Sequence, residues 1–132
     1  MENHAPYSRQ IISGPPGKNM PFSAAVGYGP FVFLSGLVGR DPVTGLISAG
    51  DVGAQTEQTL RNAAAHLTAA GSGLDRVLKT TVFLTDMSAF PAMNEAYRTA
   101  FPGDPPARSC VQVVRLPDPQ ALVEIELVAA RG

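Results

Sequence analysis

The sequence predicts an α+β domain in which two helices pack on one face of a mixed β-sheet. Two segments place apolar residues at helical spacing, and several shorter segments are rich in apolar, aromatic or β-branched residues. Helices on one side of a sheet form an economical two-layer arrangement for this order of elements. At 132 residues the chain fits a single domain, residues 1–132, in which residues 1–7 are expected to form a loose N-terminal arm.

Three short strands are expected before the first helix, over residues 8–12, 24–26 and 31–35. The residues between the second and third strands, 27–30, include two glycines and a proline, which is typical of a hairpin. Two glycines and two prolines after the first strand, at residues 14–17, indicate a loop.

The first helix is predicted to begin near Asp51, whose carboxylate can cap the first turn. Its apolar stripe follows the i, i+3, i+4, i+7 spacing and consists of Leu60, Ala63, Ala64 and Leu67. Gly71 follows this stripe and can adopt the left-handed conformation that commonly ends a helix. The segment 77–84 is rich in β-branched residues and is then expected to form a buried strand.

A second helix is expected between Asp86 and the proline-rich loop that begins at Pro102. Asp86 can cap its start, and its shared apolar face consists of Phe90, Met93, Ala96 and Tyr97. Two further strands are predicted over residues 108–115 and 122–130. We interpret the connection through residues 116–119 as a hairpin turn between these two strands.

The second face of the predicted sheet carries apolar residues that nothing in the chain covers. Burial against further copies of the same chain is the simplest solution, and closed cyclic symmetry is its usual form. The sequence therefore predicts an obligate oligomer. A stable monomer in size-exclusion chromatography with light scattering would contradict this prediction.

Composition excludes several classes of protein. Ten basic and eleven acidic residues give a formal net charge of -1, which provides little attraction for nucleic acid or anionic lipid. No segment approaches the roughly 20 apolar residues that span a bilayer, and no signal peptide is visible. A single cysteine, Cys110, excludes a disulfide framework, and the two histidines form no metal-ligand pattern. We expect a cytoplasmic protein with no metal and no nucleic-acid or membrane partner.

Arg108 is the strongest candidate for a binding residue. It begins a predicted strand directly after a proline-rich loop, so its guanidinium would be held at the end of the sheet. Strand alternation places Arg108, Cys110 and Gln112 on one face. The planar fork of donors suits a carboxylate, and each charge-assisted hydrogen bond contributes roughly 1.5–3 kcal/mol. An ordinary surface arginine or a structural ion pair is the alternative.

Glu124 and Glu126 lie two residues apart on the last predicted strand, so their side chains point the same way. A carboxylate there can hold a water and exchange protons with it, and a solvated strand face is the alternative. If the last two strands form a hairpin, Arg108 pairs several residues beyond Glu124. At roughly 3.3 Å per residue this is too far for one small substrate. If both residues are functional, we expect them to meet across a subunit boundary.

Cys110 and a glycine-rich segment are weaker candidates for chemistry. No histidine or acid stands in a recognisable pattern with Cys110, and a buried cysteine is commonly inert packing. Residues 14–18 resemble a phosphate-binding loop only superficially, because the spacing is wrong and two prolines remove N–H donors.

Several separated motifs together resemble the YjgF/Rid family of reactive-intermediate deaminases. The C-terminal motifs are Pro106-Ala107-Arg108-Ser109-Cys110-Val111 and Val123-Glu124-Ile125-Glu126. Upstream, in the family's order, stand Leu34-Ser35-Gly36, Lys79-Thr80-Thr81-Val82-Phe83-Leu84 and Met93-Asn94-Glu95-Ala96-Tyr97. The resemblance extends from about Pro21 to the C-terminus. It implies a chorismate mutase-like fold and a homotrimer with pockets between the subunits.

The resemblance also implies a reaction, the hydrolysis of reactive 2-imino acids to 2-oxo acids and ammonia without a metal or organic cofactor. The expected substrates are 2-iminopropanoate and 2-iminobutanoate. The matching position implies that Arg108 binds the substrate carboxylate and that Glu124 positions or activates the hydrolytic water. The implied substrate-binding residues are Phe22, Ser35, Gly36, Leu37, Asn94, Arg108 and Cys110.

Two of these positions depart from the family's usual pattern. Phe22 stands where a tyrosine is usual, and Leu37 stands where a glutamine is usual. Two polar groups are therefore missing, which favours a larger or more apolar imino acid. Two alternatives stay open: a pathway-specific relative that acts on a larger or aminomuconate-like substrate, and a non-catalytic module that binds a small carboxylate.

Overall fold

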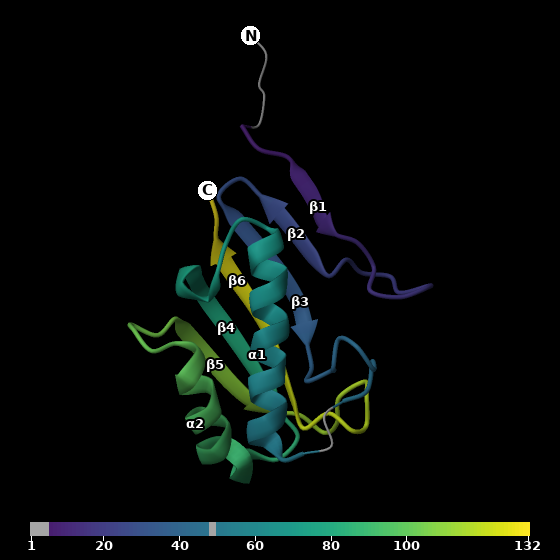
Figure 1. Ribbon diagram of the computed structural model, residues 1–132, viewed down its shortest axis with the longest axis vertical. Coiled ribbons are helices and arrows are strands. Elements are labelled where there is room, and N and C mark those ends of the chain that lie inside the picture. The colour runs from purple at the N-terminus through teal and green to yellow at the C-terminus, as the bar shows by residue number, and fades with distance from the viewer. Residues whose placement is uncertain (1–5, 48–49) are drawn as a thin grey trace.

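The computed structural model describes residues 6–47 and 50–132 and confirms the predicted α+β architecture. Within this part of the chain, six strands form one sheet, and two α-helices lie across one of its faces (Figure 1). The strands are β1 (Arg9–Ser13), β2 (Ala25–Tyr28), β3 (Phe31–Leu37), β4 (Val77–Leu84), β5 (Ala107–Gln112) and β6 (Val123–Ala130). The helices are α1 (Val52–Ala69) and α2 (Phe90–Ala100).

The strand order in the sheet is β1-β2-β3-β6-β4-β5, and only β4 and β5 are parallel neighbours. The predicted hairpin between β5 and β6 is therefore wrong. β4, α2 and β5 form a β-α-β unit, because parallel neighbours require a crossover, which a helix supplies. Residues 113–122 then carry the chain around the end of β4, where Val113 donates to Leu84 and Thr85 donates to Leu122 through the backbone.

Local capping fixes the ends of α1 as the sequence predicts. At the N-terminus, Asp51 Oδ1 accepts a hydrogen bond of 2.9 Å from the backbone N–H of Ala54. At the C-terminus, Gly71 has a φ of 77°, and the N–H of Ser72 donates to the carbonyl of Leu67. The resulting helix packs over the central strands β3 and β6.

The main core lies between the sheet and the two helices. Alternate residues of β4 and β6 point toward the helices, and Val82 and Ile125 are fully buried there. Leu67 of α1 and Met93 of α2 are also fully buried against this cluster. Most residues of the predicted apolar faces belong to this core, whereas Ala64 and Ala96 line a groove between the two helices.

The opposite side of the sheet, which we call the open face, has no helix over it in the described part of the chain. Its residues include Phe33, Lys79, Thr81, Val111, Glu124, Glu126 and Val128. Phe33 and Val111 are 45% and 44% exposed. A small second cluster of Ile47, Leu116 and Ala121 covers one end of this face beside Phe83. The rest of the open face is uncovered in the described residues and carries exposed apolar side chains beside charged ones, so the predicted presence of uncovered apolar residues is confirmed.

The N-terminal segment pairs with the edge of the sheet through β1. Residues 1–5 of the predicted arm lie outside the described residues, and the Tyr7 ring packs edge-on against the Tyr28 ring with 5.6 Å between centroids. Among the described residues, no helix has the length and apolar character needed to cross a membrane.

Candidate functional site

Arg108 lies on the edge strand β5 and points toward the side of the sheet that α2 covers. Its backbone is level with Thr80 of β4 in the parallel register. The guanidinium carbon lies 4.8 Å from the centroid of the Tyr97 ring and 5.4 Å from that of Phe90. Nη1 of the same guanidinium lies 3.8 Å from the sulfur of Met93. We call these three α2 side chains (Phe90, Met93 and Tyr97) the Arg108 cradle.

The cradle orients Arg108 without neutralising its charge. Aromatic faces attract a guanidinium, but within residues 6–47 and 50–132 no carboxylate lies at ion-pair distance from Arg108. Apart from the weak contact of Nη1 with the Met93 sulfur, its donors are therefore available to an anionic group, and their planar arrangement fits a carboxylate. Sequence reasoning assigned the cradle residues only to packing. The β-α-β order of β4, α2 and β5 is the signal that would have placed them beside Arg108.

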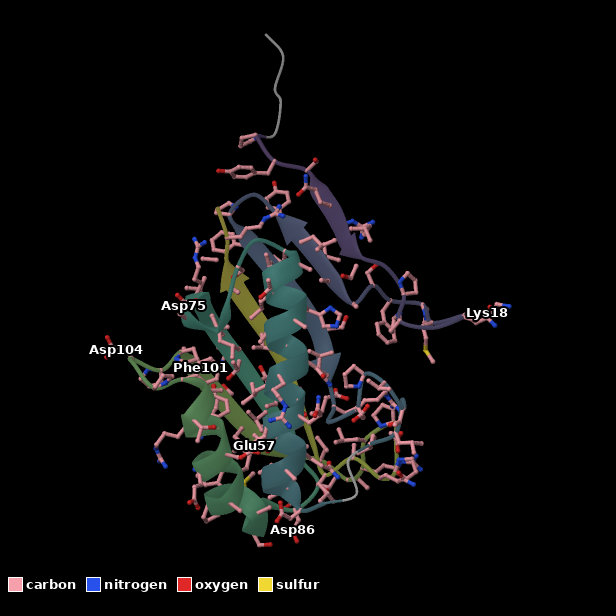
Figure 2. All side chains as sticks on the ribbon, in the orientation of Figure 1. Lys18, Glu57, Asp75, Asp86, Phe101 and Asp104 are labelled. Carbon is pink, nitrogen blue, oxygen red and sulfur yellow. The ribbon has the colours of Figure 1, made fainter. Side chains whose placement is uncertain are left out.

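The loop between α2 and β5 does not supply a partner for Arg108 either. Phe101 turns inward and packs against Tyr97, with 4.8 Å between ring centroids. Asp104 projects from the tip of the loop, away from the body of the protein (Figure 2). The acid nearest to Arg108 along the chain is thus directed into solvent.

Cys110 lies on the same side of β5 as Arg108, as strand alternation predicts, and it packs against the main core. Burial raises the pKa of the Cys110 thiol above its ordinary value, and the positive charge of Arg108 opposes this effect only in part. The thiol is therefore protonated at neutral pH, which argues against a thiolate nucleophile.

Asn94 lies on α2 one helical turn from both Phe90 and Tyr97. Its Oδ1 atom is buried and has no hydrogen-bond partner among the described residues. Because buried polar atoms in proteins are normally paired, this acceptor is suited to a donor that comes from outside the chain. Asn94 thus lies on the same two turns of α2 as the aromatic rings that contact Arg108.

Glu124 lies on the open face of β6, with its carboxylate against Gly36 of β3. It is half-buried and accepts no hydrogen bond from the described residues. Burial raises the pKa of the Glu124 carboxyl, and the negative charge of Glu126 raises it further. A carboxyl with a raised pKa exchanges protons with water more readily near neutral pH.

Arg108 and Glu124 do not meet within one chain. β4 lies between their strands, and the two side chains occupy opposite faces of the sheet. Arg108 is level with Leu127, three residues along β6 from Glu124. The two residues are therefore separated by roughly 10 Å across the sheet and roughly 10 Å along it. The sequence predicted such a separation from an incorrect hairpin, and the observed strand order produces the same separation by a different route.

The remaining predicted binding residues lie near the end of β3. Ser35 Oγ donates a hydrogen bond of 2.7 Å to the carbonyl of Ser23, which ties the loop carrying Phe22 to β3. Phe22 is 45% exposed, whereas Leu37 packs against the main core. Gly36 contacts Glu124 and Ser35 precedes it on β3, whereas Leu37 packs its side chain into the protein.

The open face also has a shallow depression of about 190 Å³ between β3, β4 and β6. Phe33, Lys79, Thr81, Glu126 and Val128 are among the residues that line it. Neither Arg108 nor Glu124 belongs to this lining, so the depression is distinct from both regions described above. The described residues contain no group of three or more histidine, cysteine, aspartate or glutamate side chains placed to hold a metal ion.

The chain matches a known family model and several known proteins over most of its length. The family model described as Endoribonuclease L-PSP matches residues 5–131. The 2-iminobutanoate/2-iminopropanoate deaminase of Mus musculus is 41% identical over 94% of this chain and 93% of its own length. The RutC family protein UK114 of Drosophila melanogaster is 46% identical over 85% of this chain and 80% of its own length.

Solved structures share the fold over nearly the whole chain. TdcF of E. coli with bound serine has a TM-score of 0.81 and 39% identity, covering 90% of this chain and 94% of its own. RidA of Psychrobacter sp. PAMC 21119 has a TM-score of 0.84 and 38% identity, covering 92% of this chain and 98% of its own. The chain therefore belongs to the YjgF/UK114/RutC family, also called the Rid family, whose model carries the description Endoribonuclease L-PSP.

Proposed function

We propose that this protein hydrolyses 2-imino acids to 2-oxo acids and ammonia. Water adds to the imine carbon, the carbon–nitrogen bond of the resulting adduct breaks, and the nitrogen leaves as ammonia. The relatives named 2-iminobutanoate/2-iminopropanoate deaminase support this reaction class. The reaction requires a fixed substrate, a positioned water and proton transfer, which amino-acid side chains can supply.

The unneutralised guanidinium of Arg108 is the observation on which this proposal rests. Held between two aromatic rings, it offers two parallel donors to the carboxylate that every 2-imino acid carries. Each charge-assisted hydrogen bond contributes roughly 1.5–3 kcal/mol, which is enough to select carboxylate substrates. The unpaired Oδ1 of Asn94 offers an acceptor for a substrate N–H.

The second half of the pocket comes from another copy of the chain, with Glu124 positioning the water. Because Arg108 and Glu124 lie on opposite faces of the sheet, one small substrate cannot contact both in a single chain. The uncovered apolar residues Phe33 and Val111 support burial of the open face against other copies. A closed trimer satisfies both requirements, since each copy then contributes Arg108 to one pocket and Glu124 to the next.

A coupled assay tests the reaction. An L-amino-acid oxidase generates 2-imino acids from several L-amino acids, and semicarbazide traps the imine that survives. Wild type is expected to lower the amount of imine that semicarbazide traps, whereas Arg108→Ala is expected to leave that amount unchanged. Arg108→Lys recovers little activity because an ammonium lacks the planar fork. Arg61→Ala, at an exposed arginine on α1, is the matched control and retains full activity. An Arg108→Ala variant as active as wild type would contradict the proposal.

The same assay shows which imines are preferred, and it separates the deaminase from the alternative of a ligand-binding module. The exposed ring of Phe22 favours imines with apolar side chains, so those derived from leucine or phenylalanine are expected to disappear faster than the one from alanine. Binding of a small carboxylate without turnover of any imine would instead support a ligand-binding module. The bound serine in E. coli TdcF favours that second function.

A further inference from the structure

β3 contains a bulge beside the Glu124 region. Leu34 pairs with Leu127 and Leu37 pairs with Ile125, so Ser35 and Gly36 together oppose one residue of β6. The bulge explains why Leu34 and Leu37 both pack against the core although they are three residues apart. It also turns Gly36 toward the open face, where Glu124 lies.

Gly36 is in direct contact with the Glu124 side chain. A Cβ atom at position 36 would lie 2.5 Å from Oε2, 2.8 Å from Cδ and 3.1 Å from Cγ of Glu124. These are its three nearest heavy atoms, and the backbone of Gly36 is outside the left-handed region. Alanine could therefore adopt the backbone conformation at position 36, and the obstacle to it is the glutamate side chain.

No hydrogen bond or ion pair from the described residues fixes the Glu124 carboxylate, so its contact with Gly36 is a contact of shape. Among the described residues none donates a hydrogen bond to Glu124. The neighbouring Glu126 repels it, and no lysine or arginine among residues 6–47 and 50–132 lies at ion-pair distance from it. The flat surface that the missing side chain leaves at Gly36 is thus what lets the carboxylate rest on the sheet.

We propose that Gly36 is a positioning residue, which seats the Glu124 carboxylate against the β3 bulge and so fixes where that carboxylate meets water. Its consequence for catalysis rests on the proposed deaminase function. We call the contact between Gly36 and the Glu124 carboxylate the seat. The seat is a property of the structure and can be tested without an activity assay. Gly36 contributes by the absence of a side chain and needs no contact with substrate.

Kinetic measurements on Gly36→Ala test the catalytic consequence. The variant is expected to lose kcat on the order of 10²-fold, with KM little changed, because a displacement of about 1 Å is enough for such a loss. Gly103→Ala is the matched control, since no heavy atom lies within 4 Å of a Cβ at that position. It retains wild-type kinetics.

A double-mutant cycle tests whether the loss in Gly36→Ala acts through the Glu124 side chain or through a general change in structure. Glu124→Asp shortens the side chain by one methylene and relieves its contact with the methyl group that Gly36→Ala adds. We expect Gly36→Ala to reduce activity much less in the Glu124→Asp background than in wild type. Equal fold losses in the two backgrounds would overturn the proposal, because independent effects multiply.

Carbon-13 NMR titration of the glutamate carboxyl groups supplies the readout that needs no activity. Gly36→Ala is expected to lift the carboxylate off the sheet and so to expose it to water. The titration midpoint of Glu124 should then move toward the ordinary glutamate value, while Gly103→Ala leaves that midpoint unchanged. A folded Gly36→Ala protein with an unchanged Glu124 midpoint would refute the seat. An inactive wild type that still shows the shifted midpoint in Gly36→Ala would refute the deaminase function and leave the seat supported.

Discussion

At the scale of single residues, Glu124 connects the proposed chemistry to stability. Its pKa in the folded chain lies above the ordinary value of 4.5, so folding favours the protonated carboxyl. Stability therefore decreases as the pH rises from below the ordinary value through the raised pKa, because the folded state holds the proton longer than the unfolded state. The carboxyl proposed to position the water thus costs stability at neutral pH.

This linkage predicts that Glu124→Gln stabilises the protein in a pH-dependent way. The melting temperature of Glu124→Gln should exceed that of wild type at about pH 7, and the difference should shrink toward about pH 4, where the wild-type carboxyl is protonated. Thermal unfolding followed by scanning fluorimetry at both pH values measures this. A difference that is the same at both values would mean that Glu124 ionisation does not contribute.

The Arg108 cradle gives a second prediction at this scale. Phe90→Leu removes one ring face from the guanidinium and should raise KM about two- to fivefold, the equivalent of the roughly 0.5–1 kcal/mol that an exposed cation–π contact contributes. Tyr97→Phe keeps the ring but removes the 2.7 Å hydrogen bond to Thr80, which is buried. It should lower stability by about 1 kcal/mol with KM unchanged. An unchanged KM in Phe90→Leu together with a raised KM in Tyr97→Phe would contradict the proposed role of the cradle.

At the scale of elements, local signals predicted the helices and strands, and pairing was the part that the sequence did not determine. The cap at Asp51, the left-handed Gly71 and the strand Val77–Leu84 appear as predicted, because each depends on neighbours in the sequence. The partner of β5 depends on contacts distant in the sequence. The prolines at residues 117 and 119 indicate a change of direction but not which strand lies alongside. The bulge at Gly36 was missed for the same reason.

The cap of α1 offers a test at the scale of one element. Asp51→Ala removes the acceptor for the Ala54 N–H and should destabilise the fold by about 1 kcal/mol. Asp51→Asn keeps an acceptor and should retain most of the stability. Urea unfolding followed by circular dichroism measures both variants, and equal losses would show that the side-chain charge, not the cap hydrogen bond, is what matters.

At the scale of the whole molecule, the net charge of the protein bears on whether it binds nucleic acid. The family description names an endoribonuclease, but a net charge of -1 provides little attraction for a phosphate backbone. We expect no cleavage of labelled single-stranded RNA and no binding by fluorescence anisotropy at low salt. Cleavage that Arg108→Ala abolishes would place RNA chemistry at the same site and contradict this expectation.

Assembly is the central claim at this scale, since the proposed pocket needs Arg108 from one copy and Glu124 from another. The most direct test mixes two inactive variants, Arg108→Ala and Glu124→Gln, by unfolding and refolding them together, with light scattering to verify that the mixture assembles like wild type. If pockets lie between copies, random mixing in equal amounts restores both residues in about a quarter of the pockets, and activity returns. If both residues act within one chain, no pocket contains both, and a mixture that assembles but stays inactive would contradict the account.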